Sequence, residues 1–421
     1  MMKEDWVEVE LGEVCKYSKG KKPKTLKKEF SEEVPFPYIN IKAFEKGIFD
    51  EYTNGIKCNL CEDGDLLMVW DGARAGFTGK AKKGVIGSTL MKIEPKVGIE
   101  KNYLFYFLLS LYRKLNTNPR GVGIPHVEPR LLWLSNLILP PLPIQRAIVS
   151  KIETLFSDLD KGIADLKKAQ EQLKIYRQAV LKKAFEGRFK IFKIEEVIEK
   201  VQIGPFGSQL HKEDYVTNGI PLINPMHIQN GKITPRIDFS VTNEKRNELP
   251  NYILETGDII MGRRGEMGRC ALVTDKEKGW FCGTGSLYLR PLKSKIFSPY
   301  LSYYLKSIIV KQYLTGRATG TTMMNLNKKI IKNIPTPVPT LSEQHQIVRE
   351  IESRLSVCDK VEQNITEALE KSEALRQSIL KKAFEGELLS PAEIEACRRE
   401  ADYEPASALL ERIRKERSSG K

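Results

Sequence analysis

A chain of 421 residues, with 41% hydrophobic and 29% charged side chains, has the composition of a soluble globular protein of two or three domains, not of a disordered or fibrous one. No run approaches the roughly 20 apolar residues of a membrane span, and the N-terminus lacks the apolar core of a secretory signal, so we expect a cytoplasmic protein. The net charge of +14 is concentrated in residues 1–144 and 188–343, with excesses of 4 and 9 positive charges, which favours a partner rich in phosphate.

Residues 1–143 are predicted to form a first α+β domain, because short apolar runs that read as strands lie between Gly, Asn and Asp turns. Seven lysines fall in the 13 residues from Lys16 to Lys28, which suits either a loop that grips phosphates or an ordinary solvated loop. Cys58 and Cys61 have the spacing of metal ligands, but no second Cys or His pair accompanies them. We therefore expect reduced thiols and no metal site.

Residues 144–187 are predicted to form one long helix, which follows the prolines at positions 140, 141 and 143 and ends at Gly187 as a C-cap. Its apolar side chains recur every 3.5 residues on average, which is the period of a coiled-coil seam. The expected seam residues include Ile148, Ile152, Leu159, Leu166, Leu173 and Tyr176. At about 1.5 Å per residue such a helix is too long to pack within either globular segment.

Residues 188–340 are predicted to form a second α+β domain, which repeats landmarks of the first. The segment from Glu255 to Met261 resembles the segment from Glu62 to Met68, for example. One amphipathic helix is expected near residues 299–314.

Residues 341–387 are predicted to form a second long helix that duplicates the first. A shift of 199 positions places Gln145 to Gly187 on Gln344 to Gly386 without a gap, with 19 of 43 residues identical, which indicates an ancient duplication. Thr340 and Glu343 predict a capping box, and Gly386 a C-cap. The expected seam, interrupted at Ser372, includes Ile347, Ile351, Val361, Ile365, Leu375 and Ile379.

The two long helices are expected to pair antiparallel, because the chain builds a whole domain between them before it returns. The predicted fold is therefore α+β, with two globular domains separated by a long antiparallel two-helix coiled coil and related by a pseudo-twofold internal repeat. Residues 388–421 are predicted to form a tail with a final helix around Ala408 to Arg417. Its charges are balanced, so we do not expect the tail to bind DNA.

This arrangement resembles the specificity subunit of type I restriction-modification enzymes over residues 1 to about 390. Each α+β domain is followed by a proline-flanked helix that ends in Lys-Lys-Ala-Phe-Glu-Gly. The Pro-x-Pro-x-x-x-Glu-Gln-x-x-Ile-Val pattern from Pro337 to Val348 and the turn from Gly204 to Ser208 are both typical of the family. The first copy departs from the pattern, with Ile144 where the family usually has Glu.

The resemblance implies two target-recognition domains that each read one half of an asymmetric bipartite DNA site, and helices that set their separation. It implies double-stranded DNA, two modification subunits and restriction subunits as partners. It also implies that this chain has no catalytic site and binds no cofactor or metal. S-adenosylmethionine is then expected on the modification subunit, and ATP and Mg on the restriction subunit.

The residues themselves agree with a non-catalytic chain, since it has no Gly-x-x-x-x-Gly-Lys-Ser/Thr nucleotide loop. The segment from Ile223 to Met226 lacks the second Pro and the aromatic residue of a methyltransferase motif. A non-DNA-binding coiled-coil scaffold that joins two protein-interaction domains is the alternative.

Candidate DNA-binding residues fall in loops rich in Lys, Arg, Gly and Thr, because lysine suits phosphates and arginine on a tight turn suits guanine. Solvated or connecting loops are the alternative for each of them. Phe206 is expected to anchor its turn in the core. The candidates are Lys19, Lys21, Lys22, Lys24, Arg74, Arg120 and His126 in the first domain, and Gly204, Ser208, Arg263, Arg264, Arg317, Thr321 and Thr322 in the second.

Overall fold

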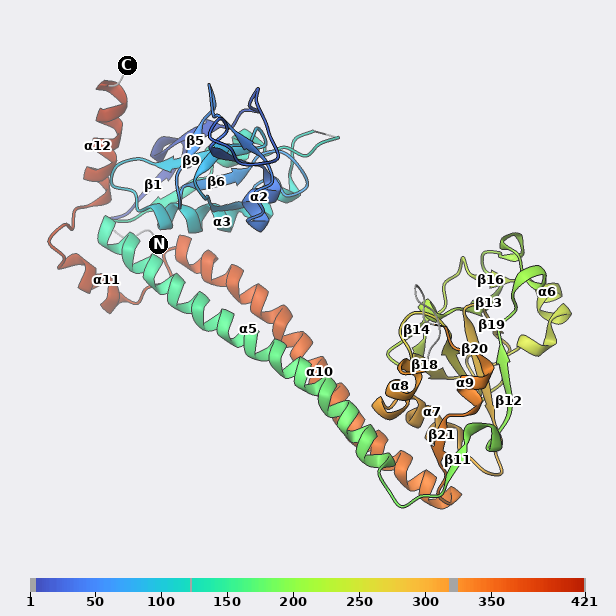
Figure 1. Ribbon diagram of the computed structural model, residues 1–421. Helices are drawn as coiled ribbons and strands as arrows, with labels where there is room; N and C mark the ends of the chain where they lie inside the picture. Colours follow the sequence, from blue (N-terminus) through green and yellow to red (C-terminus); the bar gives the residue numbers. More distant parts are fainter. Residues whose placement is uncertain (1–4, 122, 318–324, 420–421) are drawn as a thin grey trace. The chain divides into compact units, whose positions relative to one another are not determined.

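A computed structural model describes residues 5–121, 123–317 and 325–419 (Figure 1). The chain divides into two compact units, Met1–Asp165 with Ala368–Lys421, and Leu166–Glu367. Each unit holds one α+β domain, called here the first head and the second head, and a part of both long helices, α5 (Leu142–Phe185) and α10 (Leu341–Phe384). Because this division runs through both helices, the domain boundaries expected from the sequence stay predictions.

The first head contains two four-stranded sheets with α3 (Lys101–Thr117) beside them. One sheet is antiparallel throughout, and the other pairs β3 and β8 in parallel. The first sheet has the order β2 (Cys15–Lys19), β9 (Leu90–Pro95), β6 (Leu66–Val69) and β7 (Thr78–Lys80), and the second β4 (Tyr52–Thr53), β3 (Phe36–Ile39), β8 (Gly84–Ile86) and β5 (Leu60–Cys61). The remaining elements are β1 (Val7–Glu10), which pairs with β10 (Asn136–Leu139), α1 (Leu11–Val14), α2 (Ile41–Lys46) and α4 (Pro129–Trp133).

The second head repeats the antiparallel four-stranded sheet and the parallel pairing in the other sheet, but that other sheet has three strands and a short two-stranded pair is added. Its antiparallel sheet has the order β12 (Ile198–Ile203), β20 (Ser286–Pro291), β17 (Ile259–Gly262) and β18 (Cys270–Leu272), and a further sheet the order β16 (Ser240–Val241), β13 (Ile220–Ile223) and β19 (Phe281–Cys282). Two short pairs join β14 (Ile228–Gln229) to β15 (Lys232–Ile233) and β11 (Ile191–Lys193) to β21 (Pro335–Pro337). Its helices are α6 (Asn243–Glu248), α7 (Ser298–Lys306), α8 (Ile308–Thr315) and α9 (Lys328–Lys332).

The central strand of each head is buried on both faces. Along β6, Leu66 and Met68 belong to one hydrophobic cluster, which includes residues of α3, while Leu67 and Val69 belong to another. Along β17, Ile259 and Met261 belong to one cluster and Ile260 to another. Because successive strand side chains point to opposite faces, an apolar run of four residues fits only a strand that is covered on both sides.

The amphipathic helix expected near residues 299–314 is in fact two helices, α7 and α8. At Ser307 the backbone is extended, with φ −71° and ψ 153°, so the helical hydrogen-bond ladder is interrupted there. Among the described residues of the second head, five single turns of 3₁₀ helix also occur: Ile194–Glu196, Gly207–Gln209, Lys212–Asp214, Pro225–His227 and Pro250–Tyr252.

The long helices pack against each other in both units, and the same ion pair holds each contact. In the second unit the Arg177 Nη2 atom of α5 lies 2.6 Å from Asp359 Oδ1 of α10. In the first unit Arg376 of α10 pairs with Asp160 of α5 and lies over the Phe156 ring, 4.5 Å from its centre. Arg177 and Arg376, like Asp160 and Asp359, are equivalent under the 199-residue repeat, so the helices run antiparallel as expected.

The contact face of the helix pair differs from the predicted seam at three positions. Val361, Leu375 and Tyr176 are 40%, 52% and 46% exposed, so their assignment to the seam was wrong. The side chain one position later, about 100° around the helix, faces the partner helix instead and is half-buried. These residues are Glu362, Arg376 and Arg177, which form the ion pairs between the helices. Of the other predicted seam residues, Ile148, Ile152, Ile351, Ile365 and Ile379 are buried and Leu159, Leu166, Leu173 and Ile347 are half-buried.

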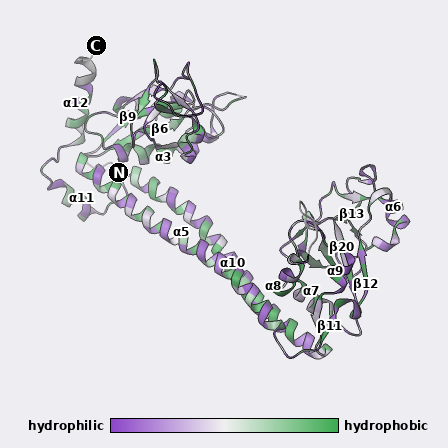
Figure 2. Ribbon diagram, in the orientation of Figure 1, coloured by the Kyte–Doolittle hydropathy of each residue, from purple (hydrophilic) through white to green (hydrophobic). Residues whose placement is uncertain are grey.

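The ends of the long helices follow the sequence signals in part. The Thr340 and Glu343 side chains each accept a backbone N–H from the other residue, which confirms the capping box. Gly386 adopts the left-handed φ of +78° that is typical of a C-cap, but Gly187 does not. Figure 2 shows that both helices mix hydrophilic and hydrophobic residues along their length, and no helix among the described residues is both long and apolar enough to cross a membrane.

The residues after α10 fold back onto the first head as α11 (Pro391–Arg398) and α12 (Ala406–Ser419) (Figure 1). Their apolar side chains belong to the hydrophobic cluster of that head, with Leu409 1% and Ile413 2% exposed. On α11, contacts with Lys151 and Ser390 lower the pKa of the Glu393 carboxyl to about 2. The predicted tail is therefore an integral part of the first unit.

Candidate nucleic-acid interface

Three loops of the first head meet at one edge, which we call the first loop edge. It comprises the loop that begins at the end of β2 (residues 19–24), the turn after β6 (residues 71–74) and the described residues before α4 (120, 121 and 123–126). The Gly72 N–H donates to the Pro125 carbonyl at 2.8 Å, which ties the turn to the third loop. The first two loops are joined by side chains, because Lys19 Nζ lies 3.1 Å from Asp71 Oδ2.

Asp71 is the central residue of the first loop edge, although the sequence did not single it out. Its Oδ1 atom lies 2.6 Å from His126 Nδ1, so one carboxylate holds side chains from two of the predicted loops. Only its place between a buried strand and a glycine could have drawn attention to it.

The lysines and arginines of the first loop edge are all exposed, but Lys19 and Arg74 are held by contacts within the head. Lys21, Lys22, Lys24 and Arg120 are exposed. Arg74 instead pairs with Glu45 at 3.1 Å and lies over the Phe77 ring, 4.0 Å from its centre. The lysine loop and Arg120 are thus available to a polyanion, while Arg74 would have to exchange its contacts with Glu45 and Phe77 for contacts with DNA.

The second head has an equivalent second loop edge, formed by the loop after β12 (residues 204–208), the turn after β17 (residues 262–268) and the chain at Asn325 and Leu326. The Arg263 N–H donates to the Gly285 carbonyl, and the Leu326 N–H donates to the Arg263 carbonyl. Thr321 and Thr322 lie outside the described residues, and of Ser208 only the backbone, in a 3₁₀ turn, is described.

The two adjacent arginines of the second loop edge have different environments. Arg263 is half-buried, and its Nε donates to the Leu326 carbonyl at 3.1 Å. Burial lowers the pKa of its guanidinium, and the charge of Arg264 adds to this effect. Arg264 is exposed. Arg317 is also exposed and lies over the Tyr313 ring, 4.2 Å from its centre.

In both loop edges a glycine allows two backbone segments to approach each other closely. A Cβ atom on Gly20 would lie 2.1 Å from the Gly87 carbonyl oxygen, and one on Gly204 would lie 1.9 Å from the Gly283 carbonyl oxygen. Only glycine fits at these positions, so Gly204 shapes the loop from within and its predicted DNA contact would come from its neighbours.

The expectation that Phe206 anchors its turn in the core was wrong, because its side chain is 65% exposed. Gly204 and Pro205, the two residues before it, are buried instead. On the other side Leu210 is buried, and Gln209 Oε1 accepts the Tyr252 hydroxyl at 2.9 Å. The turn is fixed on both sides, and Phe206 lies at its tip.

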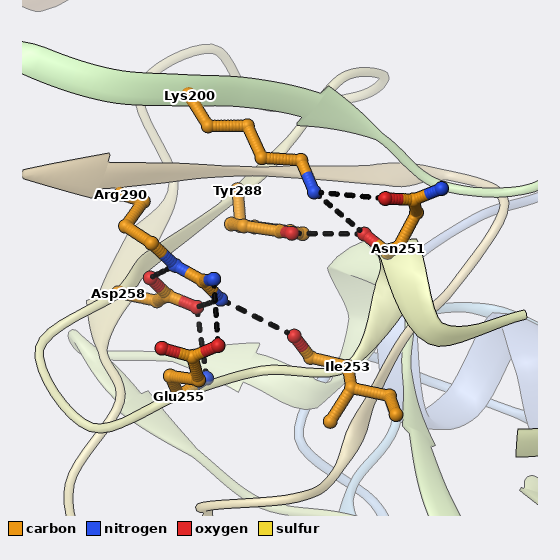
Figure 3. Close-up of polar contacts among 7 residues, drawn as sticks. All are labelled: Lys200, Asn251, Ile253, Glu255, Asp258, Tyr288 and Arg290. Atoms are coloured by element: carbon orange, nitrogen blue, oxygen red, sulfur yellow. Dashed lines mark hydrogen bonds and ion pairs between the residues drawn. The ribbon is translucent and has the colours of Figure 1, made fainter. Parts of the chain in front are cut away.

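A buried ionic cluster lies at the other end of β17 from the second loop edge (Figure 3). Arg290 donates from Nε and Nη2 to the two Asp258 carboxylate oxygens, each at 2.8 Å, and from Nη1 to Glu255 at 2.7 Å. Tyr288 donates its hydroxyl to the Asn251 carbonyl, beside Lys200. These charges satisfy one another and join β17 to β20, so we interpret the cluster as structural.

The two closely spaced cysteines do not form a ligand pair. The Cys61 thiol is buried and donates to the Lys82 and Gly84 carbonyls, and burial raises its pKa to about 11. Within residues 5–121, 123–317 and 325–419, no group of three or more His, Cys, Asp or Glu side chains could hold a metal ion.

Both copies of the repeat match a known family. The model of the type I restriction modification DNA specificity domain matches residues 3–168 and again residues 186–371. The type I restriction enzyme MjaVIII specificity subunit of Methanocaldococcus jannaschii is 29% identical over 381 residues, which cover 83% of this chain and 86% of the relative. The EcoBI specificity subunit of Escherichia coli is 26% identical over 414 residues, which cover 91% and 86%.

Two solved structures share the fold. One is a chain of the type I R-M system, from a structure solved to explain complex assembly and conformational transition. It gives a TM-score of 0.70 at 22% identity, over 92% of this chain and all of that chain. The HsdS subunit from Thermoanaerobacter tengcongensis gives a TM-score of 0.55 at 21% identity, over 92% and 98%. The duplicated architecture is therefore common to all three chains.

Proposed function

We propose how this chain, which belongs to the family of type I restriction modification DNA specificity domains, selects DNA: each head reads one half of an asymmetric bipartite site through its loop edge. The observation that supports this assignment of the site is the recurrence of one three-loop edge in both heads, with exposed cations in each. The loops differ in sequence between the heads, so the two half-sites should differ as well. The family match favours this function over a scaffold that does not bind DNA.

In this proposal the chain is a cytoplasmic, non-catalytic subunit that directs adenine methylation and restriction by its partners. Two modification subunits carry S-adenosylmethionine, and restriction subunits carry ATP and Mg. The pseudo-twofold repeat of the long helices supports two modification subunits, because each helix offers the partner a similar surface outside the part of α5 that α11 covers.

The test is genome-wide adenine methylation in cells that carry this chain with its modification subunit, compared with cells that carry the modification subunit alone. One asymmetric motif in two parts, which appears only with this chain, is the expected result. A stable complex without any such motif would instead support the scaffold alternative.

Arg264 should contribute to the recognition of one half-site only. Arg264→Ala removes an exposed guanidinium, and we expect a loss of about 1–3 kcal/mol of discrimination in the half-site read by the second head alone. Competition binding with duplexes altered in one half-site or the other measures this. Arg236→Ala, which breaks an exposed pair with Asp238 in the same head, is the control. Equal losses in both half-sites would contradict a division of labour between the heads.

A groove at the start of α10 is a candidate docking site for one modification subunit. It is lined by Ala184, Phe189, Glu343, Gln346, Ile347, Arg349 and Glu350. In the first unit the equivalent surface is covered by α11, where Glu393 reaches Lys151, the repeat equivalent of Glu350, at 2.9 Å. Because Glu350 replaces Lys151, the occupant of the open groove should be an amphipathic helix with a basic residue where α11 has Glu393.

Ile347→Asp should therefore reduce the number of modification subunits that co-purify with the chain, since it replaces one of the apolar side chains that line the groove by a charged one. Val357→Asp, at a residue of the same helix that is 63% exposed and does not line the groove, is the matched control. The subunit ratio in sedimentation or native mass spectrometry gives the answer. An unchanged ratio for Ile347→Asp would place the docking surface elsewhere.

A further inference from the structure

Phe206 combines an exposed aromatic ring with a firmly held backbone. The ring is 65% exposed, although the residues before it are buried and Gly204 approaches the Gly283 carbonyl too closely for any other residue. Pro205 restricts the backbone on one side, and Gly207 takes a left-handed φ of +62° on the other. A large apolar side chain on so constrained a turn contributes little to the core of the head.

The turn lies within the second loop edge. The Gly204 N–H donates to the Ser286 carbonyl at 2.9 Å, and the Arg263 N–H donates to the Gly285 carbonyl at 2.9 Å. Phe206 thus follows a segment that is held by the same short glycine loop as Arg263. Arg264, the residue after Arg263, and Lys212, six residues after Phe206 in sequence, are exposed cations. An exposed aromatic ring on an edge that also carries exposed cations suits a nucleic acid, which offers base faces beside phosphates.

The first head places a different residue at the same position. Gly20 fits against the Gly87 carbonyl as Gly204 fits against the Gly283 carbonyl. Counting from these glycines, Lys22 is the equivalent of Phe206, and it is exposed. One head therefore presents a cation at this point and the other an aromatic ring.

We propose that Phe206 stacks on the face of a nucleobase in the half-site read by the second head, after a base step has opened to admit it. This inference rests on the function proposed above. Apolar side chains inserted between base steps unstack and kink the duplex, and the energy of that distortion depends on the sequence that is distorted. Phe206 then selects a deformable step, whereas Lys22 in the first head binds a phosphate and contributes salt-dependent affinity.

The experiment uses the complete complex of this chain with its modification subunits and a duplex that carries the methylation motif found in cells. 2-Aminopurine replaces one base at a time in each half-site, except the adenine that becomes methylated. Its fluorescence should rise at one step of the second half-site when the complex binds, since the probe brightens when base stacking is lost.

Phe206→Ala should abolish this rise and weaken binding on the order of 5- to 100-fold. Phe206→Trp should keep both the fluorescence rise and the affinity, because it retains an aromatic ring that can stack. Phe206→Leu should lose both. Ile237→Ala, at a residue of the same head that is 67% exposed, is the control and should leave both unchanged.

Three results would overturn the inference. In the first, Phe206→Ala binds the motif as tightly as the unaltered chain while specificity is intact, which leaves the proposed function standing. In the second, Phe206→Leu restores both the binding and the fluorescence. In the third, replacing thymine by uracil in the second half-site reproduces the loss caused by Phe206→Ala, which would identify a contact with a thymine methyl group. Failure of the unaltered complex to bind any motif would reject the proposed function itself.

Discussion

Asp258→Ala should lower the free energy of unfolding of the second unit by about 3–5 kcal/mol, because it removes the carboxylate that accepts two hydrogen bonds from a largely buried guanidinium and leaves that guanidinium paired with the exposed Glu255. Asp258 is 1% exposed and the Arg290 side chain 20% exposed, so water replaces little of the lost contact. The hydrogen bonds that Asp258 accepts from Arg290 also raise the pKa of Arg290 above its ordinary value, as expected for a cation that the carboxylate stabilises.

The energy of the Asp258–Arg290 interaction can be separated from the effects of the single substitutions. Arg290→Met removes the other charge, and the double variant should be less destabilised than the sum of the single variants, since neither charge is then left buried alone. Chemical denaturation measures the free energy of unfolding of each variant. Hydrogen exchange of β12, β17 and β20 shows where protection is lost. Asp238→Ala breaks an exposed pair with Arg236 in the same head and should cost at most about 1 kcal/mol. Equal effects of Asp258→Ala and Asp238→Ala would show that burial does not strengthen this cluster.

The sequence predicted the elements that are encoded locally. Both long helices, the capping box at Thr340 and the duplicated strand that follows Asp65 and Asp258 depend on side-chain period and on residues a few positions apart. The landmarks shared by residues 62–68 and 255–261, beside the 199-residue repeat of the long helices, then predicted that the two heads share a topology. These elements could be predicted from local periodicity, and the occurrence of the same short-range pattern in both halves of the chain supported the prediction.

The details of the helix contact could not be read from hydrophobicity. Tyr176 and Leu375 are more apolar than the arginines that follow them, so an apolar seam includes them. The arginines are nevertheless half-buried, because each finds an aspartate on the antiparallel neighbour. A partner some 180 to 220 residues away in sequence is invisible to a local pattern.

The candidate site was predicted as separate loops in each domain, and the structure brings several of these loops together at one edge of each head. Sequence alone could not identify Asp71 as the link between Lys19 and His126, since that role depends on strand pairing across the head. It also misplaced Phe206, because an aromatic residue between Gly and Pro is expected to be core by composition, whereas Pro205 takes the buried place.

The packing of the tail on the first head could not be predicted from its composition, and a substitution in the tail should strongly destabilise the first unit. Residues 391–421 have balanced charges and a weak helical pattern, yet Leu409 packs against Gly98, where a Cβ atom would lie 2.1 Å from Leu409 Cδ1. The Ala406 N–H donates to the Asp5 carbonyl, and Arg398 pairs with Asp5 at 2.8 Å. The tail thus joins the start of the chain to the end of α10.

Leu409→Ala should cost the first unit about 2–5 kcal/mol of unfolding free energy, since it opens a cavity beneath α12 in the cluster that contains Trp6 and Val9. Leu134→Ala, at a residue of the same head that is 55% exposed, should change stability by no more than about 0.5 kcal/mol. Hydrogen exchange of peptides from each unit distinguishes a local from a general effect. Because the hydrophobic clusters of the two heads share no residue, protection should fall in the first unit and persist around β17. If protection around β17 falls equally, the two units unfold as one, and the tail stabilises the whole chain rather than the head on which it packs.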